Sequence, residues 1–246
     1  MTYKMGLNLV KNYSCNFSLP KRNKKIIKFI IIHYTGMKKE SDAIKRLCNL
    51  KSKVSANYFI KNNGQILTLV PDLYESWHAG ISNWKSFKLL NKYSIGIEIS
   101  NPGHSHGYKN FNPKQITSVK KLLGFLIKKY KINYKNVLGH SDIAPNRKKD
   151  PGEKFPWIDL GKSQLCHWHK LSLTELRKYR KIRLSEKEKI KFFVCLYKVG
   201  YKKITGLNIK KNNIYLTKAF QRRFRQDLVD GIIDMECFLI AKSLLK

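Results

Sequence analysis

The feature that most constrains the fold of this chain is a run of apolar residues that ends in a histidine. Residues 25–34 read KIIKFIIIHY. A short run of isoleucine and phenylalanine of this kind is typical of a buried strand. The run therefore predicts a strand that holds the imidazole of His33 rigidly at its end, where Tyr-Thr-Gly begins a loop.

Other segments carry patterns of helices and strands. Residues 113–130 give a clear helical signal, because Pro113 stands at the start and the apolar residues line one face. An Asn-Asn-Gly turn between two strand-like runs predicts a hairpin. The further elements that we expect before residue 164 are a helix at 41–50, hairpin strands at 55–61 and 65–70, and strands at 93–100 and 136–140.

The last third of the chain predicts a separate helical unit. A basic stretch with little pattern is followed by three helical patterns, at 186–199, 216–225 and 234–245. We therefore expect an α/β fold class, with a mixed central β-sheet flanked by helices plus a small C-terminal three-helix domain. The predicted parts are a first domain at 1–163 with an N-terminal extension at 1–24, a linker at 164–183, and a helical domain at 184–246.

The net charge of +34 over 246 residues fits a polyanionic partner such as nucleic acid, a membrane surface or an acidic cell-wall polymer. Lysine, isoleucine and asparagine are abundant together, however, which also fits a compositional bias of the genome. The charge is spread along the whole chain, and no nucleic-acid-binding motif of the usual kinds is present. We therefore expect no specific nucleic-acid partner.

The cysteines and the N-terminus bear on the cellular compartment. The five cysteines are widely spaced and contain no CxxC pair, so reduced thiols are the simplest expectation. The N-terminus has no apolar stretch of signal-peptide length, and no segment approaches the length of a transmembrane helix. These features favour a cytoplasmic protein; the periplasm or cell envelope is the alternative, because a chain trimmed of its signal would look the same.

Three residues at strand ends or in the adjacent loops could carry chemistry, namely His33, His140 and Asp150. Two imidazoles and one carboxylate suit a catalytic zinc ion, because three protein ligands leave the fourth position for water. From the residues alone an alternative stays open, in which the histidines are ordinary loop residues and Asp150 forms a turn with the following Pro-Gly.

Five stretches of the first domain carry a family pattern in order and spacing: IIIHYTG (30–36), VSANYFIKNNGQI (54–66), VPDLYESWHAGISNW (70–84), SIGIEISNPG (94–103) and LGHSDIAPNRKKDPGEKFPW (138–157). They resemble the type 2 N-acetylmuramoyl-L-alanine amidases, with the AmiD branch nearest and the AmpD recycling amidases as relatives. In the tail, YKVGY (197–201), AFQRRFR (219–225) and VDGIID (229–234) resemble the helical peptidoglycan-binding domain of the AmiD branch. A generic three-helix unit that packs on the first domain is the alternative for this segment.

The resemblance implies roles for individual residues. His33, His140 and Asp150 match the family's ligands for Zn²⁺, Glu98 matches the catalytic acid/base, and Lys148 matches the lysine that faces the developing oxyanion. The substrate-binding positions that it implies are His78, Ala79, Trp84, Asn101 and Arg147. Trp84 would stack on a sugar face, and packing in the core is its alternative role.

Some histidine positions fall outside this pattern. Asn57 stands where many relatives carry histidine, and we do not count it as a ligand. The clusters GHSHG (103–107) and CHWH (166–169) contain metal-binding side chains, but no second ligand pair at a structural-zinc spacing accompanies them. We expect a flexible loop and a linker there.

The function implied by the resemblance is zinc-dependent hydrolysis of the amide bond between N-acetylmuramic acid and L-alanine. The substrate would be peptidoglycan or a muropeptide, in cell-wall recycling or remodelling, and we expect a monomer. The alternative is a protein that binds peptidoglycan without cutting it. The presence of all five catalytic positions argues against that alternative.

Overall fold

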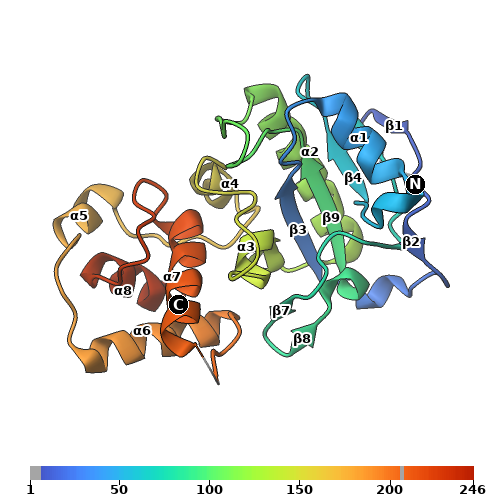
Figure 1. Ribbon diagram of the computed structural model, residues 1–246. Coiled ribbons are helices and arrows are strands. Elements are labelled where there is room, and N and C mark those ends of the chain that lie inside the picture. Colours follow the sequence, from blue (N-terminus) through green and yellow to red (C-terminus); the bar gives the residue numbers. More distant parts are fainter. Residues whose placement is uncertain (1–6, 206–207) are drawn as a thin grey trace.

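The computed structural model describes residues 7–205 and 208–246, and its centre is a six-stranded sheet (Figure 1). Across the sheet the strands follow the order β1 (Leu9–Lys11), β5 (Ile66–Thr68), β4 (Tyr58–Ile60), β9 (Ser94–Ile99), β3 (Phe29–Tyr34) and β10 (Val137–Gly139). Only the β4–β5 pair is antiparallel among these strands, so the sheet is mixed. The predicted fold class is confirmed.

The remaining elements flank this sheet or form the C-terminal unit. The helices are α1 (Glu40–Cys48), α2 (Pro113–Tyr130), α3 (His140–Ile143), α4 (Trp157–Lys162), α5 (Leu173–Lys178), α6 (Glu186–Val199), α7 (Ile209–Phe224) and α8 (Met235–Ser243). The short strands β2 (Phe17–Ser18) and β6 (Glu75–Ser76) pair with each other, as do β7 (Asn83–Trp84) and β8 (Phe87–Lys88). No helix in the described ranges is both long and apolar enough to cross a membrane.

Helix α2 has the predicted bounds because its ends are well specified. Asn112 caps its N-terminus and forms a capping box with Gln115, and Pro113 occupies the first turn, where no backbone donor is lost. Val119, Leu122, Leu123 and Leu126 are buried on one face. In the same apolar cluster lie Ile30 and Ile32 of β3, so α2 covers one face of the sheet.

The other face of β3 packs against the C-terminal helices. Side chains alternate along a strand, so Phe29 and Ile31 point away from α2. They belong to an apolar cluster, here called the interface cluster, that residues of the first domain and of the C-terminal unit share. Its members include Phe29, Ile31, Trp84 and Leu138 from the first domain and Leu196, Tyr201, Phe220 and Phe224 from the C-terminal unit. Because it is shared, this cluster joins the sheet to the helical unit as one continuous core.

Several expectations need correction. Helix α7 begins at Ile209 rather than at residue 216, and the basic stretch 164–183 contains the short helix α5. The segment 136–140 ends as a strand at Gly139, and His140 already begins α3. The N-terminal extension supplies the edge strand β1 and the short strand β2, while its residues 1–6 lie outside the described part of the chain. The division into domains stays a prediction.

Candidate active site

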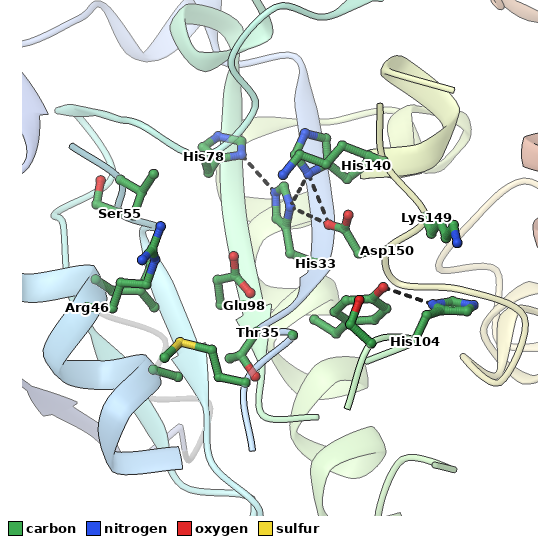
Figure 2. A pocket seen from close by; sticks show the side chains of 18 of the residues that line it. His33, Thr35, Arg46, Ser55, His78, Glu98, His104, His140, Lys149 and Asp150 are labelled. Carbon is green, nitrogen blue, oxygen red and sulfur yellow. Dashed lines mark hydrogen bonds and ion pairs between the residues drawn. The ribbon is translucent and has the colours of Figure 1, made fainter. Parts of the chain in front are cut away.

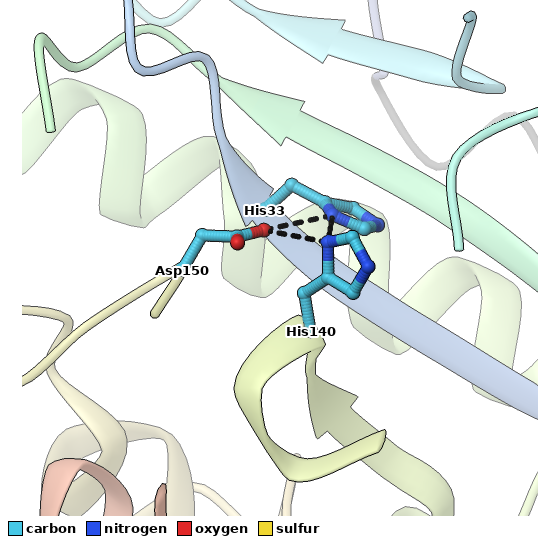
Figure 3. A group of neighbouring side chains, drawn as sticks. All are labelled: His33, His140 and Asp150. Atoms are coloured by element: carbon cyan, nitrogen blue, oxygen red, sulfur yellow. Dashed lines mark hydrogen bonds and ion pairs between the residues drawn. The ribbon is translucent and has the colours of Figure 1, made fainter. Parts of the chain in front are cut away.

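The three predicted ligands meet at one edge of the sheet, where strands β3 and β10 end (Figure 3). His33 lies near the end of β3, His140 begins α3, and Asp150 lies in the loop that follows. The Nδ1 atoms of His33 and His140 are 2.9 Å apart, and the Asp150 Oδ2 atom is 2.9 Å and 3.0 Å from them. All three side chains are buried, and they form a group able to hold a metal ion.

The tautomer of His140 follows from its outer contact. Its Nε2 atom lies 3.1 Å from the carbonyl oxygen of Ala79. A carbonyl oxygen only accepts hydrogen bonds, so Nε2 carries the proton and donates it. With the ring proton on Nε2, the Nδ1 atom of this tautomer presents a lone pair to His33 and Asp150.

A chain of hydrogen bonds fixes His33 in the same way. The Ser94 hydroxyl donates its proton to the Leu90 carbonyl oxygen at 2.6 Å, so it must accept from His78 Nε2 at 3.1 Å. The Nδ1 atom of His78 is then an acceptor, and His33 Nε2 donates to it at 3.0 Å. Burial is the main cause that lowers the pKa of His33 to about 4, and the electrostatic effect of His140 is the second. The His33 ring therefore stays neutral at physiological pH. The Nδ1 atom of His33 therefore presents a second lone pair to the site.

The donor set fits a zinc ion. Two imidazole lone pairs and a carboxylate oxygen face one another at 2.9–3.0 Å, and three acceptors at that separation repel one another unless a cation lies between them. Nitrogen and oxygen ligands of this kind are those of catalytic zinc sites. The outer hydrogen bonds of both rings, to Ala79 and to His78, are also the type that orients metal-binding histidines.

Close packing holds His78 in its place in this chain of hydrogen bonds. Its ring lies on the backbone of Gly96, and a Cβ atom built at Gly96 would be only 2.4 Å from His78 Cγ. Ser94, Gly96 and Glu98 alternate along β9 and so share one face of the strand. The glycine leaves room for the imidazole between a serine that orients it and a glutamate that borders the cavity.

Glu98 lies in register with His33 on the neighbouring parallel strand. Its Oε2 atom is buried and has no hydrogen-bond partner among the described residues. Burial raises the pKa of Glu98 well above its ordinary value; the charge of Asp150 adds to this shift, and Lys148 opposes it. A carboxylate with a raised pKa beside a metal site is suited to accept and return a proton.

A cavity of about 600 Å³ opens over these groups (Figure 2). His33, Glu98, His140, Lys148 and Asp150 all line it, so the structure brings together every predicted ligand and catalytic residue.

Of the predicted substrate-binding residues, His78 and Arg147 also line this cavity. The guanidinium of Arg147 donates to the carbonyl oxygens of Ala79 and Ile81, at 2.8 Å each. It therefore holds the loop whose Ala79 carbonyl orients His140.

The prediction that Trp84 stacks on a sugar is wrong. Trp84 is 2% exposed and packs edge-on against Tyr201, with ring centroids 4.8 Å apart. Its ring also lies against Gly200, where a Cβ atom would come within 2.5 Å of it. The alternative role was the right one, because the hairpin of β7 and β8 places Trp84 in the interface cluster.

Ala79 and Asn101 are also buried outside the cavity, so neither side chain contacts a substrate there. Ala79 acts through its carbonyl oxygen. Asn101 braces the following loop, since its side chain donates to the carbonyl oxygen of Lys109 and accepts from the Gly103 amide. Asn57 is buried and bonded to Val70, Ser76 and Gly96, which is a structural role.

The histidine-rich clusters hold no second metal group of three or more ligands within the described ranges. His104 contacts Tyr34 and Glu153, and His106 contacts the carbonyl oxygen of Gly36. Three residues near the site carry no signal in the sequence: Arg46 on the cavity wall, Ser94 beneath His78, and Asp142 beside His140. Ser94 and Asp142 lie in quoted motifs, whereas Arg46 lies between two of them, and the role of each depends on contacts with distant segments.

Comparisons with known proteins agree with this geometry. The family model described as N-acetylmuramoyl-L-alanine amidase (Amidase_2) matches residues 22–153. The N-acetylmuramoyl-L-alanine amidase AmiD of Escherichia coli is 34% identical over 233 residues, which cover 89% of this chain and 83% of AmiD. The 1,6-anhydro-N-acetylmuramyl-L-alanine amidase AmpD of the same organism is 38% identical over 105 residues, which cover 43% of this chain and 55% of AmpD.

Solved structures give the same result over most of the chain. A complex of E. coli AmiD with anhydro-N-acetylmuramic acid-L-Ala-D-γ-Glu-L-Lys superposes with a TM-score of 0.79 and 31% identity, covering 93% of this chain and 91% of that one. AmpDh3 of Pseudomonas aeruginosa in complex with an anhydromuramic pentapeptide has a TM-score of 0.77 and 27% identity, with 93% and 95% covered. Both similarities extend well beyond residues 22–153.

Proposed function

Because this chain belongs to the N-acetylmuramoyl-L-alanine amidase family, we propose that it cuts the bond between N-acetylmuramic acid and L-alanine with a zinc ion held by His33, His140 and Asp150. The observation that carries the proposal is the convergence of three electron-pair donors beside Glu98 in one cavity.

The residues of this chain divide the chemistry between them. A bound zinc ion would make a water nucleophilic near neutral pH and polarise the scissile carbonyl. Glu98 takes the proton of the attacking water and passes it to the leaving amine of L-alanine. Lys148, which lines the same cavity, faces the oxyanion that forms on the carbonyl. A single donor of this kind is worth about 3–4 kcal/mol of transition-state stabilisation.

We propose soluble anhydro-muropeptides as the substrate class, in cell-wall recycling. Support comes from the two relatives above, which were solved with ligands of this kind. The cavity has the size of a typical small-molecule site, at about 600 Å³.

A cytoplasmic monomer is part of the same proposal. All five cysteines are free thiols, which suits a reducing compartment. Cell fractionation and light scattering of the purified chain test these two points, and a periplasmic or dimeric protein would contradict them.

A product assay by mass spectrometry tests the function. The zinc-loaded protein receives purified sacculi in one tube and 1,6-anhydro-muropeptides in the other. Free stem peptides from the soluble substrate alone are expected for a recycling enzyme. Release from sacculi as well would indicate wall remodelling, and no free peptide in either tube would contradict the proposed reaction.

A further inference from the structure

A buried carboxylate lies in the same short helix as the ligand His140 and is held largely by the C-terminal unit. Asp142 is two residues after His140 in α3 and is 1% exposed. Its Oδ2 atom accepts from the Gly139 amide at 2.8 Å and from Arg223 Nη1 at 2.6 Å. Its Oδ1 atom accepts from the Tyr201 hydroxyl at 2.7 Å. Two of these three donors belong to the C-terminal part of the chain.

Arg223 forms hydrogen bonds on both sides of the segment that carries the ligand His140. It projects from α7, is 2% exposed, and also donates through Nη2 to the Val137 carbonyl oxygen at 3.0 Å. Its guanidinium lies over the ring of Trp157, 4.5 Å from the centroid. Val137 begins β10 and Asp142 lies in α3, so one side chain ties together the residues before and after Gly139 and His140.

We propose that Arg223 and Tyr201 are positioning residues for His140, so that the C-terminal unit completes the metal site of the first domain. This inference rests on the proposed function, because it assigns His140 to a zinc ion. Without Arg223, the charge of Asp142 stays buried with too few donors, which is strongly unfavourable. Asp142 then rotates away, the Gly139 amide loses its acceptor, and His140 moves from its ligand position.

Several side chains of the motif AFQRRFR face the interior of the protein. Gln221, Arg223 and Arg225 are at most 2% exposed, so these side chains face the interior and not a wall polymer. Of these three, Arg223 is the one whose side chain reaches α3 and β10 among the described residues. Arg225 bonds within its own unit, to Asp230 and Asp234.

Arg225 therefore provides a matched control. It lies on the same segment as Arg223, is equally buried at 2%, and is paired with carboxylates in the same manner. Replacing it by Met removes a buried ion pair from the helical unit without touching Asp142. A loss of stability that leaves the metal site intact would appear in both variants. Weaker zinc binding through a misplaced His140 would appear in the Arg223 variant and not in the Arg225 variant.

The experiment compares the full chain with R223M, R223K, Y201F and R225M. Zinc affinity is measured by competition with a chromophoric chelator, and melting temperature, kcat and KM are measured on the same preparations. We expect R223M to bind zinc at least about tenfold more weakly and to lose kcat with little change in KM. R225M should keep its zinc affinity within about twofold. R223K should recover part of the loss, because lysine restores the charge but not both hydrogen bonds.

Y201F keeps the test decisive if R223M does not fold, since it removes one hydroxyl and should weaken zinc binding by a smaller factor. Equal zinc affinities in R223M, Y201F and the parent, or equal losses in R223M and R225M, would overturn the proposal. Zinc affinity is independent of turnover. A parent chain that binds zinc and releases no peptide would contradict the amidase reaction, and the affinities would still decide the role of Arg223.

Discussion

His33 and Glu98 stand opposite each other on the parallel strands β3 and β9, so the first metal ligand and the proposed proton carrier point to the same side of the sheet. Parallel neighbours in register keep this relationship without any loop. The geometry of the reaction centre is therefore set by strand pairing at the middle of the sheet.

Replacing Glu98 by Gln should abolish turnover and leave the metal site intact. The amide keeps the shape of the side chain but cannot accept the proton of the attacking water. We expect kcat to fall by at least about a hundredfold with unchanged zinc content, measured by product release and metal analysis. A variant that keeps its turnover would remove Glu98 from the mechanism.

The same substitution should change how stability depends on pH in the chelator-treated protein. Burial raises the folded-state pKa of Glu98 above its ordinary value of 4.5. The folded state therefore keeps a proton that the unfolded state releases, and this contribution is complete below pH 4.5 and lost as pH rises through the folded-state pKa. E98Q should be more stable than the parent at pH 7 and nearly equal to it at pH 4, as judged by chemical denaturation. An equal difference at both pH values would show that Glu98 is ionised without cost.

Replacing Ser94 by Ala should weaken zinc binding without touching a ligand. The hydroxyl fixes the proton of His78 on Nε2, and His78 in turn keeps the proton of His33 on the atom that faces away from the site. With Ser94 gone, the His78 ring is free to donate to His33, which moves the His33 proton onto Nδ1. We expect about tenfold weaker zinc binding in a chelator competition.

Ser118 gives a control for this experiment, since its hydroxyl on α2 donates to the Gly64 carbonyl oxygen at 2.6 Å, away from the histidines. S118A should bind zinc like the parent. Equal affinities in S94A and S118A would mean that the serine does not set the tautomer.

Trp84→Ala should affect folding far more than substrate binding. Removing a fully buried tryptophan from the interface cluster should lower the free energy of unfolding by about 3–5 kcal/mol. Trp77, by contrast, lines the cavity and is only partly buried. Denaturant titration and kinetics should show a large stability loss with nearly unchanged KM for W84A, and a raised KM for W77A. A raised KM in W84A at full stability would restore the sugar-stacking role.

Arg46 should recognise a carboxylate of the stem peptide. It lines the cavity from α1, on the side away from Asp150 (Figure 2). The γ-linked glutamate in the ligand of the E. coli relative leaves its α-carboxylate free, and guanidinium groups bind carboxylates in a bidentate manner. We expect R46A to raise KM about tenfold for a substrate with this carboxylate and hardly at all for its amidated counterpart. Equal effects on both substrates would exclude a carboxylate contact.

The sequence predicted those elements whose signals are local. The apolar run before His33 predicted β3, and Pro113 together with the apolar face that follows it predicted α2. The site residues came from motif resemblance, since nothing in the spacing of His33 and His140 says that their strands are neighbours. That relationship is a property of the sheet order.

What the sequence did not predict depends on partners far along the chain. Strand β1 is three residues long and exists through its pairing with β5. The burial of Trp84 requires Tyr201, and the role of Asp142 requires Arg223. No local pattern distinguishes a tryptophan that meets a sugar from one that meets another ring, so these assignments need the tertiary structure.

The interface cluster also has a consequence for the synthesis of the chain. Ile31 leaves the ribosome roughly 190 residues before Phe220, and at about 5–20 residues per second this corresponds to about 10–40 s. Throughout that interval the face of β3 formed by Phe29 and Ile31 lacks the helices that cover it. The nascent chain thus exposes an apolar strand face until its last helices emerge, and transiently exposed surface of this kind is prone to aggregation.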